Sequence, residues 1–344
     1  MRLVVITQRV DPEDPALGAT VAKLRALAAH VDELVVLALV ARPVDLPANV
    51  RVKEFGAGGQ LLRGARLVGL LAPELRRRPV AVLAHMSPIY AVLAAPVTRP
   101  LRVPLLLWFT HWRQSRTLKL AERLATKVLS VSDQSFPLPS RKVVATGHGI
   151  EVPDERPAPR ADDGTLRLVS LGRTSPAKGL ATVIEAVQLL DGVPVEAELR
   201  GPSLTEAELA HRRELATLID ELGLEDRVRL EGPVPQSATH SVYARSDVLV
   251  NNMRSGALDK VVYEAAASGL PVVVASEGFE PLVRGIDPAL RFAQDDAADL
   301  ADRLRALHEA GSERRRAIGG ELRGRIVRDH SVERWAERVV EAAR

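Results

Sequence analysis

The fold of this chain is indicated first by the stretch SGALDKVVYEAAASGLPVV, which occupies residues 255–273. A Ser-Gly turn opens a helical pattern, the pattern stops at Gly269, and Pro271 leads into a strand of valines. The first free N–H groups of a helix and the positive end of its dipole favour an anion. Glu264 could accept hydrogen bonds from a diol, as an acidic residue does for ribose in dinucleotide folds. The stretch fits a phosphate-and-ribose site, and it equally fits an ordinary α/β connection whose Glu264 is solvated.

A second stretch, LRLVSLG at residues 166–172, is an apolar strand that ends at a glycine. Arg173 and Lys178 flank the short turn that follows, before a helical run over 180–190. Ligands bind at the carboxyl ends of strands in open α/β sheets, and a guanidinium fork with an ammonium suits a diphosphate. Because both cations lie in the same half of the chain as Glu264, the two stretches together favour a nucleotide site over solvated side chains.

Apolar strands alternate with helical patterns along the whole chain, which is typical of parallel sheets. In the first half we expect strands at 2–7, 34–40, 50–54, 80–84, 104–109, 127–131 and 142–146, and helices at 18–30, 60–78, 87–98 and 115–126. In the second half we expect strands at 166–171, 194–199, 227–231, 247–251 and 271–275, and helices at 178–190, 205–223, 237–245 and 258–268. The tail over 296–344 is predicted to be helical, with one interruption at His330-Ser331.

The two stretches resemble the nucleotide-sugar-binding half of the family 4 retaining glycosyltransferases, which have the GT-B fold. That family carries Gly-Arg and, a few residues on, Lys-Gly for the donor diphosphate, and a helical Glu before Gly-x-Pro-Val for the ribose. Gly172-Arg173, Lys178 and Glu264 match these positions. The resemblance covers nearly the whole chain and implies transfer of a sugar from a nucleoside diphosphate sugar to a hydroxyl. The donor-binding residues that it implies are Gly172, Arg173, Lys178, Ser255, Gly256, Ala257, Leu258, Lys260 and Glu264.

One position departs from the family pattern, which has a second Glu upstream of the ribose Glu, near the donor sugar. This chain has Gly256 there, so donor-sugar contacts would come from backbone amides or from neighbours such as Asp259 or Lys260. The missing Glu is the feature that would fit a catalytically degenerate nucleotide-sugar-binding subunit. A nucleotide-sugar epimerase of the same fold is a further alternative, and it would need an acid/base pair in its cleft.

The resemblance and the alternation predict an α/β protein with two Rossmann-like, doubly wound domains that face each other across a cleft. The acceptor-side domain is expected over 1–150 and the nucleotide-sugar-binding domain over 166–328. A polar, proline-rich linker over 151–165 separates them. The C-terminal helix over 329–344 is expected to pack back towards the N-terminal domain.

His111 is interpreted as the end of a buried strand that faces the cleft, where it could hydrogen-bond a donor or acceptor hydroxyl. A purely structural histidine is the alternative. With Arg173 and Lys178 it forms the predicted catalytic set. Four further residues are expected at the acceptor or in the cleft, with a solvated turn and a plain hinge as the alternatives: Asp11, Gly18, His148 and Gly149.

Composition narrows the class of protein. A chain of 344 residues is expected to form two domains. Cysteine is absent, which excludes disulfides, a thiolate metal site and a Cys nucleophile, and fits a reducing compartment. The chain starts directly as a strand without a signal-peptide pattern, and no apolar run approaches the roughly 20 residues of a spanning helix. We therefore expect a cytoplasmic protein.

Charge is distributed unevenly. Residues 1–163 carry 23 Lys and Arg against 15 Asp and Glu, whereas the remainder carries 24 against 29. The basic first half and the apolar-basic helix at 60–78 predict weak association with the inner face of the plasma membrane, where a lipid-linked acceptor is met. The alternative is a soluble enzyme whose basic face attracts an anionic saccharide. Scarce aromatics and the lack of a helix-turn-helix, zinc or RNP pattern argue against nucleic acid.

No cofactor or bound metal is expected besides the donor substrate. Arg173, Lys178 and helix N-terminal amides would stabilise the leaving diphosphate in place of a cation. Asp295-Asp296 could pass for a metal pair, but its place before a helix favours N-capping. Biosynthesis of a cell-envelope glycan, a polysaccharide or a glycolipid is the expected role.

Overall fold

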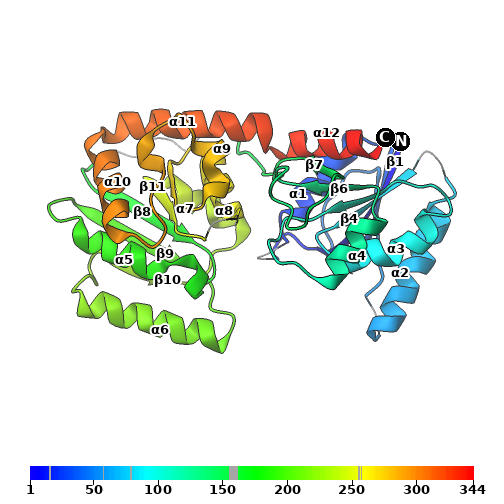
Figure 1. Ribbon diagram of the computed structural model, residues 1–344, viewed down its shortest axis with the longest axis horizontal. Helices are drawn as coiled ribbons and strands as arrows, with labels where there is room; N and C mark the ends of the chain where they lie inside the picture. The colour runs from blue at the N-terminus through cyan, green and yellow to red at the C-terminus, as the bar shows by residue number, and fades with distance from the viewer. Residues whose placement is uncertain (15–16, 57, 78–79, 155–161, 255, 257) are drawn as a thin grey trace. The chain divides into compact units, whose positions relative to one another are not determined.

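The computed structural model describes residues 1–14, 17–56, 58–77, 80–154, 162–254, 256 and 258–344. The chain divides into two compact units (Figure 1). Unit 1 comprises Met1–Glu151 and Asp329–Arg344, and unit 2 comprises Val152–Arg328.

Within the described residues, unit 1 is built on a seven-stranded parallel sheet with the order β3-β2-β1-β4-β5-β6-β7. Its strands are β1 (Arg2–Val10), β2 (Glu33–Ala41), β3 (Val50–Glu54), β4 (Val80–His85), β5 (Leu105–Trp108), β6 (Lys127–Ser130) and β7 (Val143–Ala145). Its helices are α1 (Thr20–Ala28), α2 (Gln60–Glu74), α3 (Pro88–Thr98), α4 (Arg116–Leu124) and α12 (Val332–Ala343).

Both faces of this sheet are buried, as expected for parallel strands. Alternation along β1 supplies the two faces: Val4 and Ile6 pack with α2, α3 and α4, whereas Leu3 and Val5 pack with α1 and α12. The order of the strands reverses between β1 and β4, so the carboxyl ends of these two strands mark the switch point of unit 1.

Unit 2 repeats the same construction with five parallel strands among the residues described, in the order β10-β9-β8-β11-β12. Its strands are β8 (Leu166–Leu171), β9 (Val195–Arg200), β10 (Val228–Glu231), β11 (Val248–Asn251) and β12 (Val272–Val274). Its α-helices are α5 (Leu180–Leu189), α6 (Glu206–Glu221), α7 (Thr239–Ala244), α8 (Lys260–Ala267), α9 (Glu280–Val283), α10 (Ala297–Glu309) and α11 (Gly311–Asp329). Short 3₁₀ turns include η1 (Pro176–Lys178) and η2 (Gln236–Ala238). The switch point lies between β8 and β11, and two doubly wound α/β sheets confirm the predicted fold class.

Most element boundaries differ from the sequence prediction by a few residues, and three differences have a local cause. β1 continues to Val10 because its last residues still pair with β2. The helix that carries Glu264 begins at Lys260, since Asp259 is extended at φ −70° and ψ 124°. The C-terminal tail is interrupted a second time, between α10 and α11, where Gly311 has a φ of +77° that does not continue a right-handed helix.

The C-terminal helix α12 belongs to the core of unit 1. Its Trp335 meets Trp108 of β5 edge-on, with ring centroids 5.7 Å apart. Just before α12, the amide of Ile150 donates to the carbonyl of His330 at 2.8 Å, and the amide of Val332 donates to the carbonyl of Ile150 at 2.8 Å. The segment that leaves unit 1 and the segment that returns to it therefore lie side by side and are hydrogen-bonded to each other.

Candidate functional site

Lys178 sits where the sequence prediction placed it, in the turn that follows β8. Its ammonium donates to the carbonyl of Leu171 at 3.3 Å and forms an ion pair with Asp259, which immediately precedes α8. Because α8 follows β11, this ion pair joins the loops after β8 and β11. It therefore spans the switch point of unit 2, the place where open α/β sheets bind their ligands.

Glycines bring the loops around Lys178 into close contact. A Cβ at Gly172, whose φ is +133°, would clash with the Lys178 ammonium. A Cβ at Gly201, after β9, would clash with the carbonyl of Gly172. Gly179 has a φ of +56° and packs on the side chain of Asn252, whose Nδ2 donates to the Gly179 carbonyl at 3.2 Å. All three glycines have a positive φ that other residues rarely adopt, and Gly201 also lies too close to the Gly172 backbone for a Cβ.

Arg173 lies at the same edge of the sheet, but its side chain contacts α6, the helix that follows the neighbouring strand β9. Its guanidinium is 3.2 Å from Oε1 of Glu208 in the first turn of α6, and its side chain is 58% exposed. Glu208 is itself fixed, because its Oε2 accepts from the amide of Leu204 at 2.7 Å. The two cations predicted to bind the diphosphate, here called the clamp cations, thus have their partners on opposite sides of β8. Arg173 is accessible and Lys178 is largely buried.

Glu264 is buried inside α8 rather than solvated, which removes the solvated alternative. Its Oε1 accepts from Lys260 Nζ at 2.7 Å and from Gln236 Nε2 at 2.9 Å. The hydroxyl of the neighbouring Tyr243 donates to the carbonyl of Val261 at 3.4 Å. Burial first, and then the charges of Glu264 and Asp259, raise the pKa of Tyr243 well above its usual value, so the hydroxyl stays protonated.

The structure describes only part of the start of the stretch at residues 255–273. Ser255 and Ala257, both predicted donor contacts, lie outside the described residues. Gly256 has a φ of +86°, with no atom within 4 Å of where its Cβ would be among the residues that the structure describes. Leu258 packs on Gly278, whose Cβ would lie 2.8 Å from Leu258 Cδ2.

His111 was wrongly expected at the end of a buried strand. β5 ends at Trp108, and His111 lies three residues later on an exposed loop. Its Nδ1 accepts from the amide of Arg113 at 3.0 Å, and its ring stacks on Trp112 with centroids 5.7 Å apart. The strand ends at Trp108 although the next residue, Phe109, is also apolar and buried.

Asp11 is also not a solvated turn residue, because its side chain is only 5% exposed. Its Oδ2 is 3.1 Å from the Arg42 guanidinium, and its Oδ1 accepts from the amide of Glu13 at 3.1 Å. Gly18 closes the same loop: a Cβ there would lie 2.7 Å from the Pro12 carbonyl. Both residues therefore shape the loop after β1, at the switch point of unit 1.

His148 and Gly149 lie between α1 and α12. His148 is buried and meets the Trp108 ring edge-on at 6.4 Å. A Cβ at Gly149 would lie 2.6 Å from Lys23 Cε and 3.0 Å from the Trp335 ring. These contacts favour the hinge interpretation of this loop, since its glycine is required for docking the C-terminal helix.

Sequence reasoning missed a buried cluster beneath this loop. His85, at the end of β4, stacks on Trp108 with ring centroids 5.0 Å apart and planes 2° from parallel. The Lys23 ammonium lies 3.8 Å above the centre of the Trp108 ring. Burial, together with the Lys23 charge, lowers the pKa of His85 to about 3, so its imidazole is neutral near pH 7.

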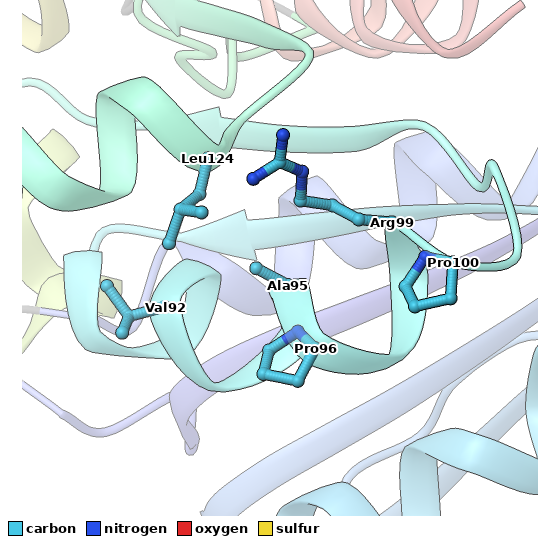
Figure 2. A pocket seen from close by; sticks show the side chains of 6 residues that line it. All are labelled: Val92, Ala95, Pro96, Arg99, Pro100 and Leu124. Atoms are coloured by element: carbon cyan, nitrogen blue, oxygen red, sulfur yellow. The ribbon is translucent and has the colours of Figure 1, made fainter.

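A pocket of about 470 Å³ opens on unit 1, and none of the predicted site residues lines it (Figure 2). Its lining is apolar apart from Arg99 and comes from α3, α4 and the segment after α3: Val92, Ala95, Pro96, Arg99, Pro100 and Leu124. The pocket includes the carboxyl-terminal ends of both helices, which lie at the amino edge of a parallel α/β sheet, opposite the edge that binds ligands.

The predicted N-cap at Asp295-Asp296 is confirmed for the second residue. Asp296 Oδ1 accepts from the amide of Asp299 at 2.9 Å and so caps α10. Asp295 instead accepts from Nδ2 of Asn252 at 2.9 Å, and its own amide donates to Asn252 Oδ1 at 3.1 Å.

The model of the family of glycosyl transferases group 1 matches residues 151–323, and the chain belongs to this family. This is the protein class that the resemblance in the donor stretches predicts, and the family 4 assignment is compatible with it.

Curated relatives include two bacterial glycosyltransferases. The chain is 30% identical over 237 residues to the D-inositol 3-phosphate glycosyltransferase of Thermobispora bispora, an alignment that covers 60% of this chain and 54% of that protein. It is 31% identical over 173 residues to the lipopolysaccharide core biosynthesis glycosyltransferase LpsD of Rhizobium meliloti, with 48% of each chain covered. The chain therefore spans about half the length of the curated relatives that it matches.

Solved structures share the fold over the whole chain. Anabaena Alr3699/HepE, solved in complex with UDP, superposes with a TM-score of 0.77 at 18% identity over 99% of both chains. Sucrose-phosphate synthase from Thermosynechococcus elongatus superposes with a TM-score of 0.78 at 17% identity, over 99% of this chain and 98% of that one. These likenesses establish the GT-B fold.

Proposed function

We propose that this protein is a retaining glycosyltransferase that moves a sugar from a nucleoside diphosphate sugar to an acceptor hydroxyl. The observation that carries the proposal is the grouping at the switch point of unit 2. Arg173 and Lys178 lie beyond the carboxyl end of β8, and Glu264 lies in the helix after the adjacent β11. Membership of the glycosyl transferases group 1 supports the reaction class.

The residues of unit 2 would divide the work of binding the donor. Arg173 and Lys178 bind the diphosphate and stabilise the charge that develops on it as the glycosidic bond to the leaving group breaks. Glu264 accepts hydrogen bonds from the ribose diol. His111, on an exposed loop of unit 1, would hydrogen-bond a hydroxyl of the acceptor. Retention at the anomeric carbon follows the resemblance to family 4.

Thermal shift with UDP, GDP and ADP tests the binding step, and the corresponding nucleoside diphosphate glucoses test the chemistry. We expect one of the nucleotides to raise the melting temperature, because a ligand that binds only the folded state stabilises it. Stabilisation by none of them, with a cooperative melt, would contradict the proposal. Binding without sugar transfer to any acceptor would favour the degenerate subunit, and conversion of the donor sugar without an acceptor would favour the epimerase.

The reaction should not require a divalent cation. Arg173 and Lys178 supply the positive charge that a metal supplies elsewhere. We expect turnover to be unchanged after treatment with EDTA and unchanged when Mg²⁺ or Mn²⁺ is added back. A loss of activity on chelation that either ion restores would contradict this expectation.

Acceptors of the cell envelope are the proposed class, since one relative is named for lipopolysaccharide core biosynthesis. We propose that the protein meets a lipid-linked acceptor at the inner face of the plasma membrane. None of the described helices is both long and apolar enough to cross a membrane, so the contact would be peripheral. Residues 55–121 contain ten Lys and Arg but a single acidic residue, Glu74, which is buried.

The start of α2 gives this contact a location. Leu61 is 93% exposed and Leu62 is 54% exposed, whereas Leu67 and Leu71 of the same helix are fully buried. α2 follows the carboxyl end of β3, so this apolar tip lies at the ligand-binding edge of unit 1. An exposed apolar tip on a basic segment suits an anionic bilayer surface.

Sedimentation with vesicles containing anionic lipid tests the membrane contact. Each basic residue near such a surface contributes about 1 kcal/mol, screened over roughly 8–10 Å, so binding should fall as salt rises. Leu61→Ser with Leu62→Ser should weaken it most. Neutralising Arg76, Arg77 and Arg78, which follow the other end of α2 and the last of which lies outside the described residues, should weaken it less. Arg213→Gln in unit 2 is the control. Protein that stays in the supernatant at low salt would favour a soluble enzyme with an anionic saccharide acceptor.

A further inference from the structure

Every cation of the proposed donor site already faces a carboxylate. Arg173 lies 3.2 Å from Glu208, Lys260 lies 2.7 Å from Glu264, and Lys178 is paired with Asp259. An entering diphosphate therefore does not meet free positive charge. It has to compete with a carboxylate that the chain itself provides.

The pairs at the two clamp cations differ in how firmly they are held. Arg173 is 58% exposed, and a pair of that kind is weak because water and salt screen it. Lys178 and Asp259 are only 13% and 17% exposed. A third group fixes Asp259, since Asn251 Nδ2 donates to its Oδ2 at 3.0 Å. The competition is therefore decided at Lys178.

The Asp259 carboxylate has an alternative hydrogen-bonding position at the N-terminus of α8. Asp259 occupies the N-cap position of α8 with extended backbone, but its carboxylate accepts no hydrogen bond from that helix. An Asp at this position ordinarily accepts from an amide of the first turn. Asn251 Oδ1, the oxygen of the amide that donates to Asp259, is buried without a hydrogen-bond partner in the described part of the chain, so this amide is only half satisfied by the pairing that exists.

We propose that Asp259 is an internal counter-ion that competes with the donor diphosphate for Lys178 and turns to cap α8 when the diphosphate binds. The inference rests on the proposed donor site. It makes Asp259 a specificity-determining residue, because only a ligand that carries more negative charge than one carboxylate displaces it. Asp259 is also one of the two neighbours, with Lys260, that the sequence offers near the missing upstream Glu at Gly256.

Calorimetry of the full chain with UDP, GDP and ADP tests the proposal on whichever nucleotide the wild type binds. Asp259→Asn removes the competing charge and keeps the side-chain shape, so the Kd should fall at least about 10-fold. In a Lys178→Gln background the same substitution should change the Kd less than about 2-fold, because the competition no longer exists. Asp163→Asn is the matched control, since Asp163 pairs with Arg167 at the opposite end of β8.

A Kd for Asp259→Asn that is unchanged or higher, in a protein that melts like the wild type, would overturn the proposal. So would an equal gain in the Lys178→Gln background, because the effect would then not act through Lys178. If Asp259→Asn does not fold, Asp259→Ser keeps an oxygen for the N-cap and carries the same expectation. A wild type that binds no nucleoside diphosphate contradicts the proposed function itself, which separates the two failures.

Discussion

Lys178→Ala should lower turnover at least about 100-fold, the scale of losing one preorganised donor to a developing charge. The ammonium contacts the Leu171 carbonyl and Asp259, and Gly172 has no Cβ that would occupy its place. Its position is therefore fixed before any ligand arrives. Its removal also leaves the Asp259 carboxylate beside the diphosphate, where like charges repel. The loss should therefore exceed that of a surface lysine by far.

Arg173→Ala should also lower turnover about 100-fold, because it removes the diphosphate contact on the β9 side of β8. Its exposed guanidinium exchanges Glu208 for the diphosphate at little cost. Steady-state rates of nucleoside diphosphate release with saturating donor and acceptor measure both variants. Arg167→Ala, at the amino end of the same strand, is the matched control and should keep wild-type turnover. Near wild-type rates in both Arg173→Ala and Lys178→Ala would contradict the assignment of the diphosphate site.

The fold was predictable because local patterns determine it. Short uninterrupted apolar runs such as Leu3 to Ile6 and Val248 to Val250, rich in β-branched residues, favour strands buried on both faces, and they alternate with helical patterns. The missed break at Gly311 shows the limit of this reasoning. A glycine within a helical pattern is compatible with either a continuous helix or a left-handed kink, and the choice depends on tertiary packing.

The donor half of the site was predictable because its ligands come from two short stretches of sequence. The partners of those residues were not, since Glu208, Asn251 and Gln236 come from segments whose sequences carry no motif. The prediction for His111 was wrong for a different reason. The apolar run continues to Phe109, past the end of β5 at Trp108, so the sequence does not reveal the last residue of the strand. The sequence of the Gly149 loop fitted a ligand loop and a hinge equally, and the structure shows that its glycine allows the close approach of Trp335.

Glu264→Ala should weaken binding of the nucleoside diphosphate by about 1.5–3 kcal/mol, the range for a hydrogen bond to a charged group, or roughly 10- to 150-fold in Kd. The buried carboxylate already accepts from Lys260 and Gln236, so it is oriented before the ribose arrives. Calorimetry with the preferred nucleoside diphosphate measures the change.

Removing this carboxylate also leaves buried polar groups unpaired, so fold and binding have to be separated. Glu264→Gln retains an oxygen for the ribose and is expected to keep a cooperative melt, with a binding loss smaller than that of Glu264→Ala because only the charge is lost. Glu196→Ala, which removes an exposed carboxylate paired with Arg229 in β10, is the control for unit 2 and should leave affinity unchanged. Unchanged affinity in a well-folded Glu264→Ala would exclude the residue from the ribose site, because a hydrogen-bonded carboxylate cannot be removed from a binding site without cost.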